Sequence, residues 1–279
     1  MTKNISESTD FYAQNFIHLK LQKKSDQLWI TLDNPEQGNA ITPGMIESLC
    51  KVLKYADFDP KIRVFIITGA GKNFCSGGDV KAMSERTGMF QGESNELRLR
   101  YMHGIQQIPK TIEDLSTPLI AMVNGAAIGA GCDLAMMCDL RVGASTTKFG
   151  ETFTKIGLVP GDGGTFFLQR IVGYAKAMEM TLTADVYEGQ KAKDFGLMNF
   201  LVEDAHLLME TEKLAEKIAN NAPVAQQMAK KAMKISYLHD LQTSLDLLAS
   251  FQGIAQRTQD HFEALEAVKG QRPPHFQGQ

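Results

Sequence analysis

The chain has 279 residues, of which 43% are hydrophobic and 22% are charged, the balance of a soluble globular protein rather than of a disordered or fibrous one. Its 29 Lys and Arg residues against 32 Asp and Glu residues give a formal net charge of -3, which lacks the basic footprint of a protein that binds nucleic acid. The four cysteines, Cys50, Cys75, Cys132 and Cys138, lack the spacing of a zinc site or a disulfide framework, so we predict free thiols in a reducing compartment.

The N-terminal segment 1–15 is polar and lacks the apolar stretch of a signal peptide, so it is predicted to be a flexible arm. The most apolar stretch, 118–135, is interrupted by Asn124, three glycines and Asp133, whereas a bilayer-spanning helix needs about 20 predominantly apolar residues. We therefore expect a cytoplasmic protein without a membrane anchor.

Strand signals open the chain and then alternate with helical ones. Residues 17–22 alternate with period two and 28–32 follow after a polar turn, which predicts a β-hairpin. A helix is predicted from Thr42, an N-cap residue followed by Pro43, to about residue 57. The apolar runs 64–68 and 119–123 are typical of strands buried on both faces. The alternation predicts an α/β fold with a largely parallel sheet.

From Thr165 onward the signals are mainly helical. Apolar residues recur with helical spacing in 167–172, 175–182, 189–194 and 205–220, and a further helix begins near Met228. We therefore divide the chain into an α/β core at 16–200 and a helical C-terminal region at 201–279.

Two glycine-rich segments, 71–81 and 124–133, each leave a buried strand and enter a helix. Small residues there let a ligand approach the main chain, although ordinary turns that need glycine give the same pattern. The pair Gly129 and Gly131 does not fit a dinucleotide fingerprint, because residues 140–148 offer no acidic partner for a ribose. Two turns that each direct one N–H at a common carbonyl oxygen would form an oxyanion hole.

These segments, with Asn39-Ala40-Ile41 before them and Gly157 to Thr165 after them, resemble the crotonase (enoyl-CoA hydratase/isomerase) superfamily. The resemblance implies a ClpP/crotonase-type spiral of ββα turns with two roughly perpendicular sheets. It implies a helical C-terminal region that assembles trimers or dimers of trimers. It also implies an acyl-CoA thioester substrate, with coenzyme A as part of the substrate and no metal or other cofactor.

The family's functional positions transfer onto this sequence by the same resemblance. The two oxyanion amides fall on Gly78 and Ala130. The positions that hold coenzyme A or line the acyl site fall on Asn39, Ala40, Ser76, Gly77, Asp79, Val80, Lys81 and Phe153. Lys81 would lie near the phosphates, and its alternative is an ordinary solvated charge.

Enolate chemistry requires a group that moves a proton at carbon, and a partly buried carboxylate can do so. Asp133 follows the second glycine turn, where typical hydratases carry Glu. The second Glu of the hydratases is replaced by Phe153, which cannot move protons. We predict that Asp162 takes its place, whereas Glu151 is expected to point away.

Each carboxylate also has a purely structural alternative. Asp133 could be paired with a basic group, and Asp162 could cap the amides of Gly164 and Thr165. His103 either lines the acyl pocket beneath a mobile cover formed by 84–100, or faces solvent or the core.

The resemblance predicts an enzyme that adds water to the double bond of a 2-enoyl-CoA through an enolate stabilised by the oxyanion hole. The pair Asp133 and Asp162 resembles the aspartate pair of dienoyl-CoA isomerases, so isomerisation of an enoyl-CoA or dienoyl-CoA double bond is the alternative reaction. A non-catalytic acyl-CoA-binding protein is the alternative from another class, because the second Glu is missing.

Overall fold

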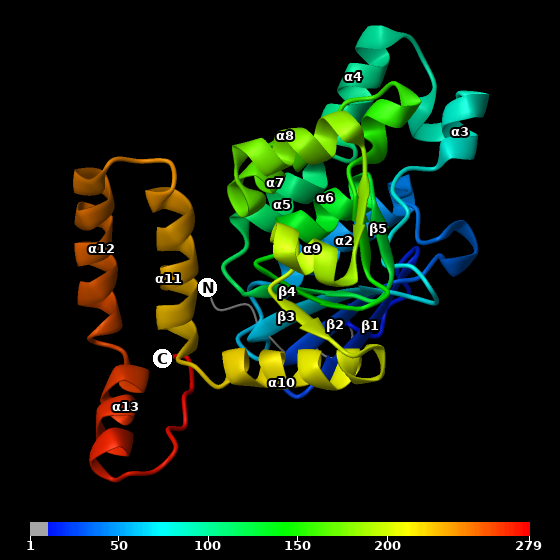
Figure 1. The fold of residues 1–279 in the computed structure, drawn as a ribbon. Helices are drawn as coiled ribbons and strands as arrows, with labels where there is room; N and C mark the ends of the chain where they lie inside the picture. The colour runs from blue at the N-terminus through cyan, green and yellow to red at the C-terminus, as the bar shows by residue number, and fades with distance from the viewer. Residues whose placement is uncertain (1–10) are drawn as a thin grey trace.

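A computed structural model describes residues 11–279, which form two β-sheets and a set of surrounding helices (Figure 1). The larger sheet has six strands in the order β1 (Leu19–Lys24), β2 (Gln27–Leu32), β3 (Val64–Gly69), β4 (Leu119–Val123), β6 (Leu140–Ala144) and β9 (Phe200–Val202). The smaller sheet has the order β5 (Ala126–Ile128), β7 (Lys148–Gly150) and β8 (Val186–Glu188). In the larger sheet only β1 is antiparallel to its neighbour, which confirms the hairpin and the α/β class.

The helices of the core are α2 (Pro43–Ala56), α3 (Val80–Glu85), α4 (Ser94–His103), α5 (Gln107–Asp114), α6 (Ala130–Met137), α7 (Gly164–Val172), α8 (Tyr174–Thr183), α9 (Gly189–Phe195) and α10 (Leu207–Ala219). Short 3-10 turns lie at η1 (Pro35–Gln37), η2 (Gly88–Phe90), η3 (Thr152–Ile156) and η4 (Asp204–His206). Three helices follow at the C-terminus, α11 (Pro223–Ser236), α12 (Leu241–Ala255) and α13 (Gln259–Lys269).

The predicted start of α2 is confirmed. The hydroxyl of Thr42 accepts a hydrogen bond of 3.2 Å from the amide of Met45, and Pro43 occupies the first turn, where its missing N–H leaves no bond unmade. One face of the helix, including Met45, Leu49 and Leu53, is buried against the sheet. This burial, rather than helix propensity, supplies most of the stability of such an amphipathic helix.

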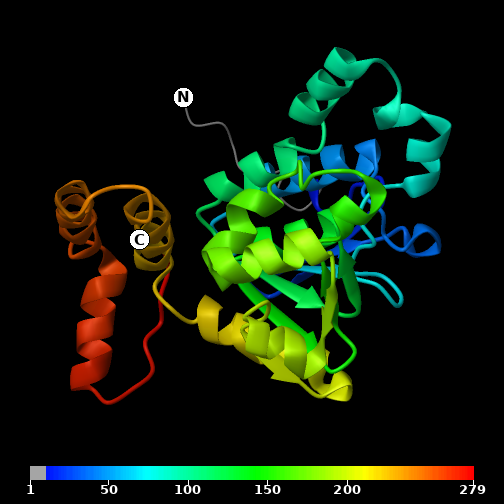
Figure 2. The ribbon, with the colours of Figure 1, turned by 45° about the horizontal axis from the view of Figure 1, so that its top comes forward.

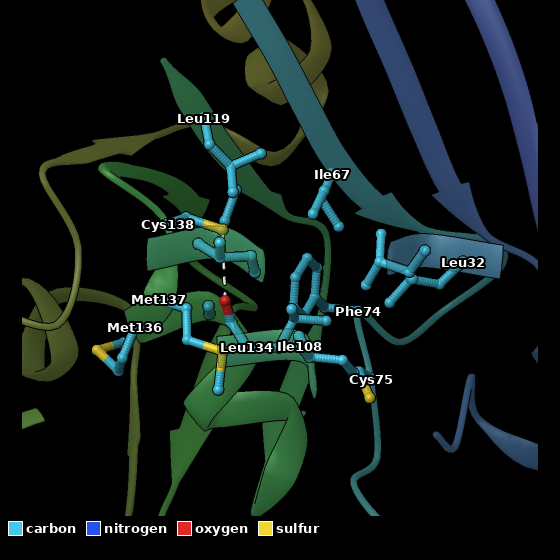
Figure 3. Close-up of a cluster of buried hydrophobic side chains, with 14 of the residues drawn as sticks. Leu32, Ile67, Phe74, Cys75, Ile108, Leu119, Leu134, Met136, Met137 and Cys138 are labelled. Carbon is cyan, nitrogen blue, oxygen red and sulfur yellow. Dashed lines mark hydrogen bonds between the residues drawn. The ribbon is translucent and has the colours of Figure 1, made fainter. Parts of the chain in front are cut away.

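The main core lies between the larger sheet and the helices that follow its strands. Figure 3 shows Phe74 at the centre of this cluster, between Ile67 of β3 and the apolar side chains of α5 and α6. The thiol of Cys138 donates a 3.3 Å hydrogen bond to the carbonyl oxygen of Leu134. The core therefore fixes α6, which carries Asp133, against the strands of the sheet.

The opposite face of the sheet is covered by α10 (Figure 1). Leu207, Ala215 and Ala219 pack there in a second buried cluster with side chains from β2, β3, β4 and β6. Strand β9 and helix α10 follow the predicted boundary at residue 200, and both pack with the α/β core. Apolar periodicity identified the helix but could not reveal which surface it covers.

Helices α11, α12 and α13 form an arm beside the core, as both ribbon views show (Figures 1 and 2). The chain after α13 returns along this arm, where the carboxylate of Asp260 accepts hydrogen bonds from the amides of Gln277, at 2.6 Å, and Gly278, at 2.8 Å. Arg63 of the core donates to the carbonyl oxygens of Ala219 and Phe276. The arm is thus tied to the core at the junction after α10.

The predicted N-terminal arm requires a correction at its end. Phe11 is buried and its ring stacks on that of Tyr55 with centroids 3.6 Å apart, while the hydroxyl of Tyr12 donates a 2.8 Å hydrogen bond to Asp59. Residues 11 and 12 therefore pack on α2, and residues 1–10 lie outside the described part of the chain. Among residues 11–279, no helix combines the length and apolarity needed to cross a membrane.

Candidate active site

The two glycine-rich turns lie against each other at one end of the sheets. The amide of Cys75 donates to the carbonyl oxygen of Ala126 at 3.0 Å, and the amide of Ile128 donates to the carbonyl oxygen of Cys75 at 3.0 Å. A Cβ atom placed on Gly131 would lie 2.1 Å from the carbonyl oxygen of Cys75, a distance that side chains cannot tolerate. Glycine at this position lets α6 begin directly beside the first turn.

The main-chain amides of Gly78 and Ala130 lie on these adjoining turns. Gly77 has a positive φ of +95°, and a Cβ atom on it would stand 3.4 Å from the Ala130 nitrogen. Ala130 is the first residue of α6, so its N–H has no partner within the helix. Among the described residues, neither amide donates to another backbone group. Both are therefore available to an acceptor from outside the chain.

Three carboxyl groups come together next to these turns. Asp133 projects from α6, Glu151 follows β7, and Asp162 lies in the turn before α7. Asp133 and Glu151 are fully buried, and Asp162 is 2% exposed. Both oxygens of Asp133, both of Glu151 and Oδ1 of Asp162 accept no hydrogen bond from a donor in the described chain. Buried polar atoms are usually satisfied, so this cluster differs from an ordinary structural carboxylate.

Asp133 is the middle group of the three, since it lies within hydrogen-bonding range of both Glu151 and Asp162. Burial raises the pKa of Asp133 well above its usual range, and the negative charge of Glu151 raises it further. Burial likewise raises the pKa of Asp162, with the charge of Asp133 as the next cause. Burial also raises the pKa of Glu151. The cluster therefore holds protons in a pH range where exposed carboxyl groups are ionised.

Neither of the structural alternatives for the two aspartates is observed. Asp133 has no basic partner in the described chain, and the causes of its raised pKa include no cation. Asp162 does not cap α7, whose N-cap is Gly163 without a side-chain hydrogen bond. Instead α7 begins beside Asp133, because a Cβ atom on Gly164 would lie 2.0 Å from Asp133 Oδ1. The expectation that Glu151 points away from the site is wrong, because its buried carboxyl group lies next to that of Asp133.

Apolar side chains surround the same place. A Cβ atom on Gly129 would lie 3.7 Å from the ring of Phe153, and one on Gly78 would lie 2.4 Å from the terminal methyl of Met83. The ring of Tyr101 lies 3.3 Å from a Cβ position on Gly161. Sequence reasoning missed Met83 and Tyr101, although apolar residues within the largely polar segment 79–103 were a usable signal.

The residues expected to hold coenzyme A fall into two groups. Ser76, Val80 and Lys81 are exposed on the rim of the first turn. Asn39 and Ala40 are buried. The amide group of Asn39 donates to the carbonyl oxygens of Ala70 and Asn73, so its side chain holds the loops in place rather than facing a ligand.

Asp79 is the N-cap of α3, where its carboxylate accepts a 3.0 Å hydrogen bond from the amide of Ala82. His103 ends α4 and is exposed. It lines a hollow of about 420 Å³ shared with α2, whose lining residues do not include the three carboxyl groups. The solvent-facing alternative for His103 is therefore the one observed.

A family model described as enoyl-CoA hydratase/isomerase matches residues 23–279. The crotonyl-CoA hydratase of Syntrophomonas wolfei is 32% identical over 92% of this chain and 96% of its own. The 1,2-epoxyphenylacetyl-CoA isomerase of Escherichia coli is 32% identical over 89% of this chain and 94% of its own. A crystal structure of the Bacillus anthracis enoyl-CoA hydratase superposes with a TM-score of 0.88 at 31% identity, covering 94% of this chain and 100% of that one. The predicted crotonase fold is thereby confirmed, and the chain belongs to the enoyl-CoA hydratase/isomerase family.

Proposed function

We propose that this protein hydrates the double bond of a 2-enoyl-CoA. The observation that carries the proposal is the group of buried, unpartnered carboxyl groups beside two unbonded main-chain amides. Family membership and the hydratase names of the relatives support the same activity. A protein that only bound acyl-CoA would gain nothing from burying three carboxyl groups without donors, which is costly.

In the proposed complex the thioester oxygen accepts hydrogen bonds from the amides of Gly78 and Ala130. Donors fixed before the reaction stabilise the negative charge as the enolate forms, and the loss of one such donor costs on the order of 3 kcal/mol in related sites. The positive end of α6 acts in the same direction. The nucleotide part of coenzyme A would lie along the exposed rim formed by Ser76, Val80 and Lys81.

The proton transfers are assigned to Asp133 and Asp162, one ionised and the other protonated. The ionised group takes a proton from water as the water oxygen bonds to Cβ, and the electrons of the double bond move to the thioester oxygen. The protonated group then gives its proton to Cα as the enolate collapses. Only water, carboxyl groups and amides take part in this proposed step, which therefore balances without a metal or redox cofactor.

A double-bond isomerase is the second candidate, because the two contacting aspartates provide proton carriers on one side of the acyl site. The relative from Escherichia coli is named as an isomerase. In that reaction one carboxylate removes a proton from one carbon and returns it to another, and no water is added.

We further propose that the chain assembles as a homotrimer or a dimer of trimers through the C-terminal arm. Met233, Leu241 and Val268 on the three helices of the arm are each more than 70% exposed, and such apolar surface usually marks an interface. A cytoplasmic location is proposed because the four cysteines are free, buried thiols, as expected in a reducing compartment.

The test is turnover of crotonyl-CoA, followed by the loss of its conjugated thioester absorbance, with wild type, Asp133→Asn and Asp162→Asn. We expect wild-type turnover and a loss of at least about 100-fold in kcat for each variant, as for the removal of a general acid or base. Full activity of Asp162→Asn would contradict the two-carboxylate mechanism. Shifting of a 3-enoyl-CoA double bond without hydration would favour the isomerase. Binding without turnover of any enoyl-CoA would favour the non-catalytic protein.

A further inference from the structure

We propose that Glu151 is a positioning residue that shares one proton with Asp133 and receives that proton when Asp133 takes another from the substrate side. The inference rests on the proposed function, because it assigns Glu151 a part in the same proton transfer. It goes beyond the pair of Asp133 and Asp162, and it concerns a residue whose side chain was expected to point away.

The position of Glu151 fits this role. The residue directly follows β7, which is held on one side by β5 and on the other by β8. Its side chain is fully buried, and neither oxygen accepts a hydrogen bond from an N–H or O–H group of the described chain. Its carboxyl group lies within hydrogen-bonding range of Asp133 and of the Cys132 thiol. Two neighbouring carboxyl groups can form a hydrogen bond only if one of them carries a proton, because an ionised carboxylate only accepts.

The groups around the cluster offer no cation that could replace this proton. Helix α6 contributes Cys132 and Asp133, and the turn before α7 contributes Asp162. Beyond Asp162 lie the Cys75 thiol and the Tyr101 hydroxyl. No Lys, Arg or His pairs with the three carboxyl groups in the described chain. Three buried negative charges without a counterion would be prohibitive, so the cluster must hold protons.

The proposed step conserves charge and protons. In the resting state Asp133 and Glu151 together hold one proton and one negative charge. When Asp133 accepts a proton from water, the shared proton moves to Glu151 and the pair becomes neutral. When the pair returns a proton, the negative charge is restored. Asp133 can thereby act as a base although it is fully buried. The single negative charge of the resting state is shared by the two carboxyl groups and is neutralised when Asp133 accepts a proton.

The first experiment compares the pH profiles of kcat/KM for wild type, Glu151→Gln and Glu151→Asp. A glutamine keeps the shape but removes the like charge and donates a hydrogen bond to Asp133, which favours its ionised form. We expect the profile of Glu151→Gln to move to lower pH by about one to three units, the size of shift that one nearby charge produces. Glu151→Asp keeps a titrating carboxyl group and is expected to retain a profile close to that of wild type. Glu203→Gln, an exposed residue before η4, is the matched control and should change nothing.

A pH profile of Glu151→Gln identical to that of wild type would overturn the proposal, since a residue with a purely structural role would lower activity or stability without moving the profile. The second experiment needs no turnover. Carbon-13 NMR of the side-chain carboxyl groups in the protein without substrate reports the titration of Asp133 directly. The midpoint of the Asp133 titration should shift to lower pH in Glu151→Gln. If the wild type hydrates no enoyl-CoA, the proposed function fails, yet this measurement still decides whether Glu151 and Asp133 share a proton.

Discussion

At the scale of single residues, the proposed proton transfers depend on carboxyl groups that are buried without nitrogen or oxygen donors. The sequence predicted Asp133 and Asp162 because their positions relative to the glycine turns match those of family carboxylates. It could not predict Glu151, because the direction of a side chain after a three-residue strand is decided by the elements that pack around it. The polar contacts of the cluster link three segments that are remote in sequence, and such contacts leave no local pattern.

The raised pKa values make stability depend on pH. A group whose pKa is higher in the folded than in the unfolded state binds more protons when folded. Its contribution to the free energy of unfolding is therefore fully present at pH values below its pKa in the unfolded state, which is near 4 for carboxyl groups. This contribution is lost as the pH rises through the pKa in the folded state. We expect the free energy of unfolding of wild type to fall between pH 5 and pH 8 by more than that of Asp133→Asn, which lacks one such group. Urea unfolding at both pH values measures this.

Asp114→Asn, at an exposed position at the end of α5, is the control and should retain the wild-type difference between the two pH values. If Asp133→Asn also retains the full difference, Asp133 does not hold a proton in this pH range. Its raised pKa would then not describe the folded protein.

At the scale of elements, the site depends on two turns that touch. The sequence predicted both turns and the long strands before them, because apolar runs and glycine clusters are local signals. It did not predict β5, β7 or β8, since strands of three residues are too short to show periodicity. These strands form the second sheet, and β5 carries the hydrogen bonds that join the two turns.

The close approach of the turns can be tested with a pair of glycine variants. Gly131→Ala places a methyl group against the Cys75 carbonyl oxygen, so the two turns must separate. We expect a loss of more than about 2 kcal/mol in the free energy of unfolding together with a loss of activity. Gly253→Ala on α12 meets no atom within 4 Å and should raise stability by about 0.5 to 1 kcal/mol, because alanine favours a helix interior.

Urea unfolding and the crotonyl-CoA assay report the two effects separately. A Gly131→Ala protein with wild-type stability and activity would show that the turns tolerate separation, and the geometry proposed for the oxyanion hole would then be wrong.

At the scale of the whole molecule, the chain consists of an α/β core and a helical arm. The sequence indicated helices after residue 200, but it could not separate α10, which covers the sheet, from the arm helices, because all of them show the same apolar periodicity. Val268 on α13 is 78% exposed, and the proposed subunit interface on the arm would cover it.

The assembly is tested by light scattering coupled to gel filtration. Wild type is expected to have the mass of three or six chains. Val268→Asp is expected to dissociate at protein concentrations at which wild type stays assembled, because the substitution places a charge in the apolar interface. Gln259→Asp adds the same charge at an exposed polar position of the same helix and should leave the mass unchanged. A monomeric wild type, or equal dissociation of the two variants, would contradict assembly through the arm.

The central claim is that the amides of Gly78 and Ala130 stabilise an enolate while a buried carboxyl group moves the proton at Cα. The most direct measurement is the exchange of Cα protons of a saturated acyl-CoA in heavy water, followed by proton NMR, because it requires enolate formation and neither hydration nor isomerisation. We predict that wild type catalyses the exchange and that the double variant Asp133→Asn/Asp162→Asn binds the same acyl-CoA without exchanging its protons. Binding by wild type without any exchange would contradict the account.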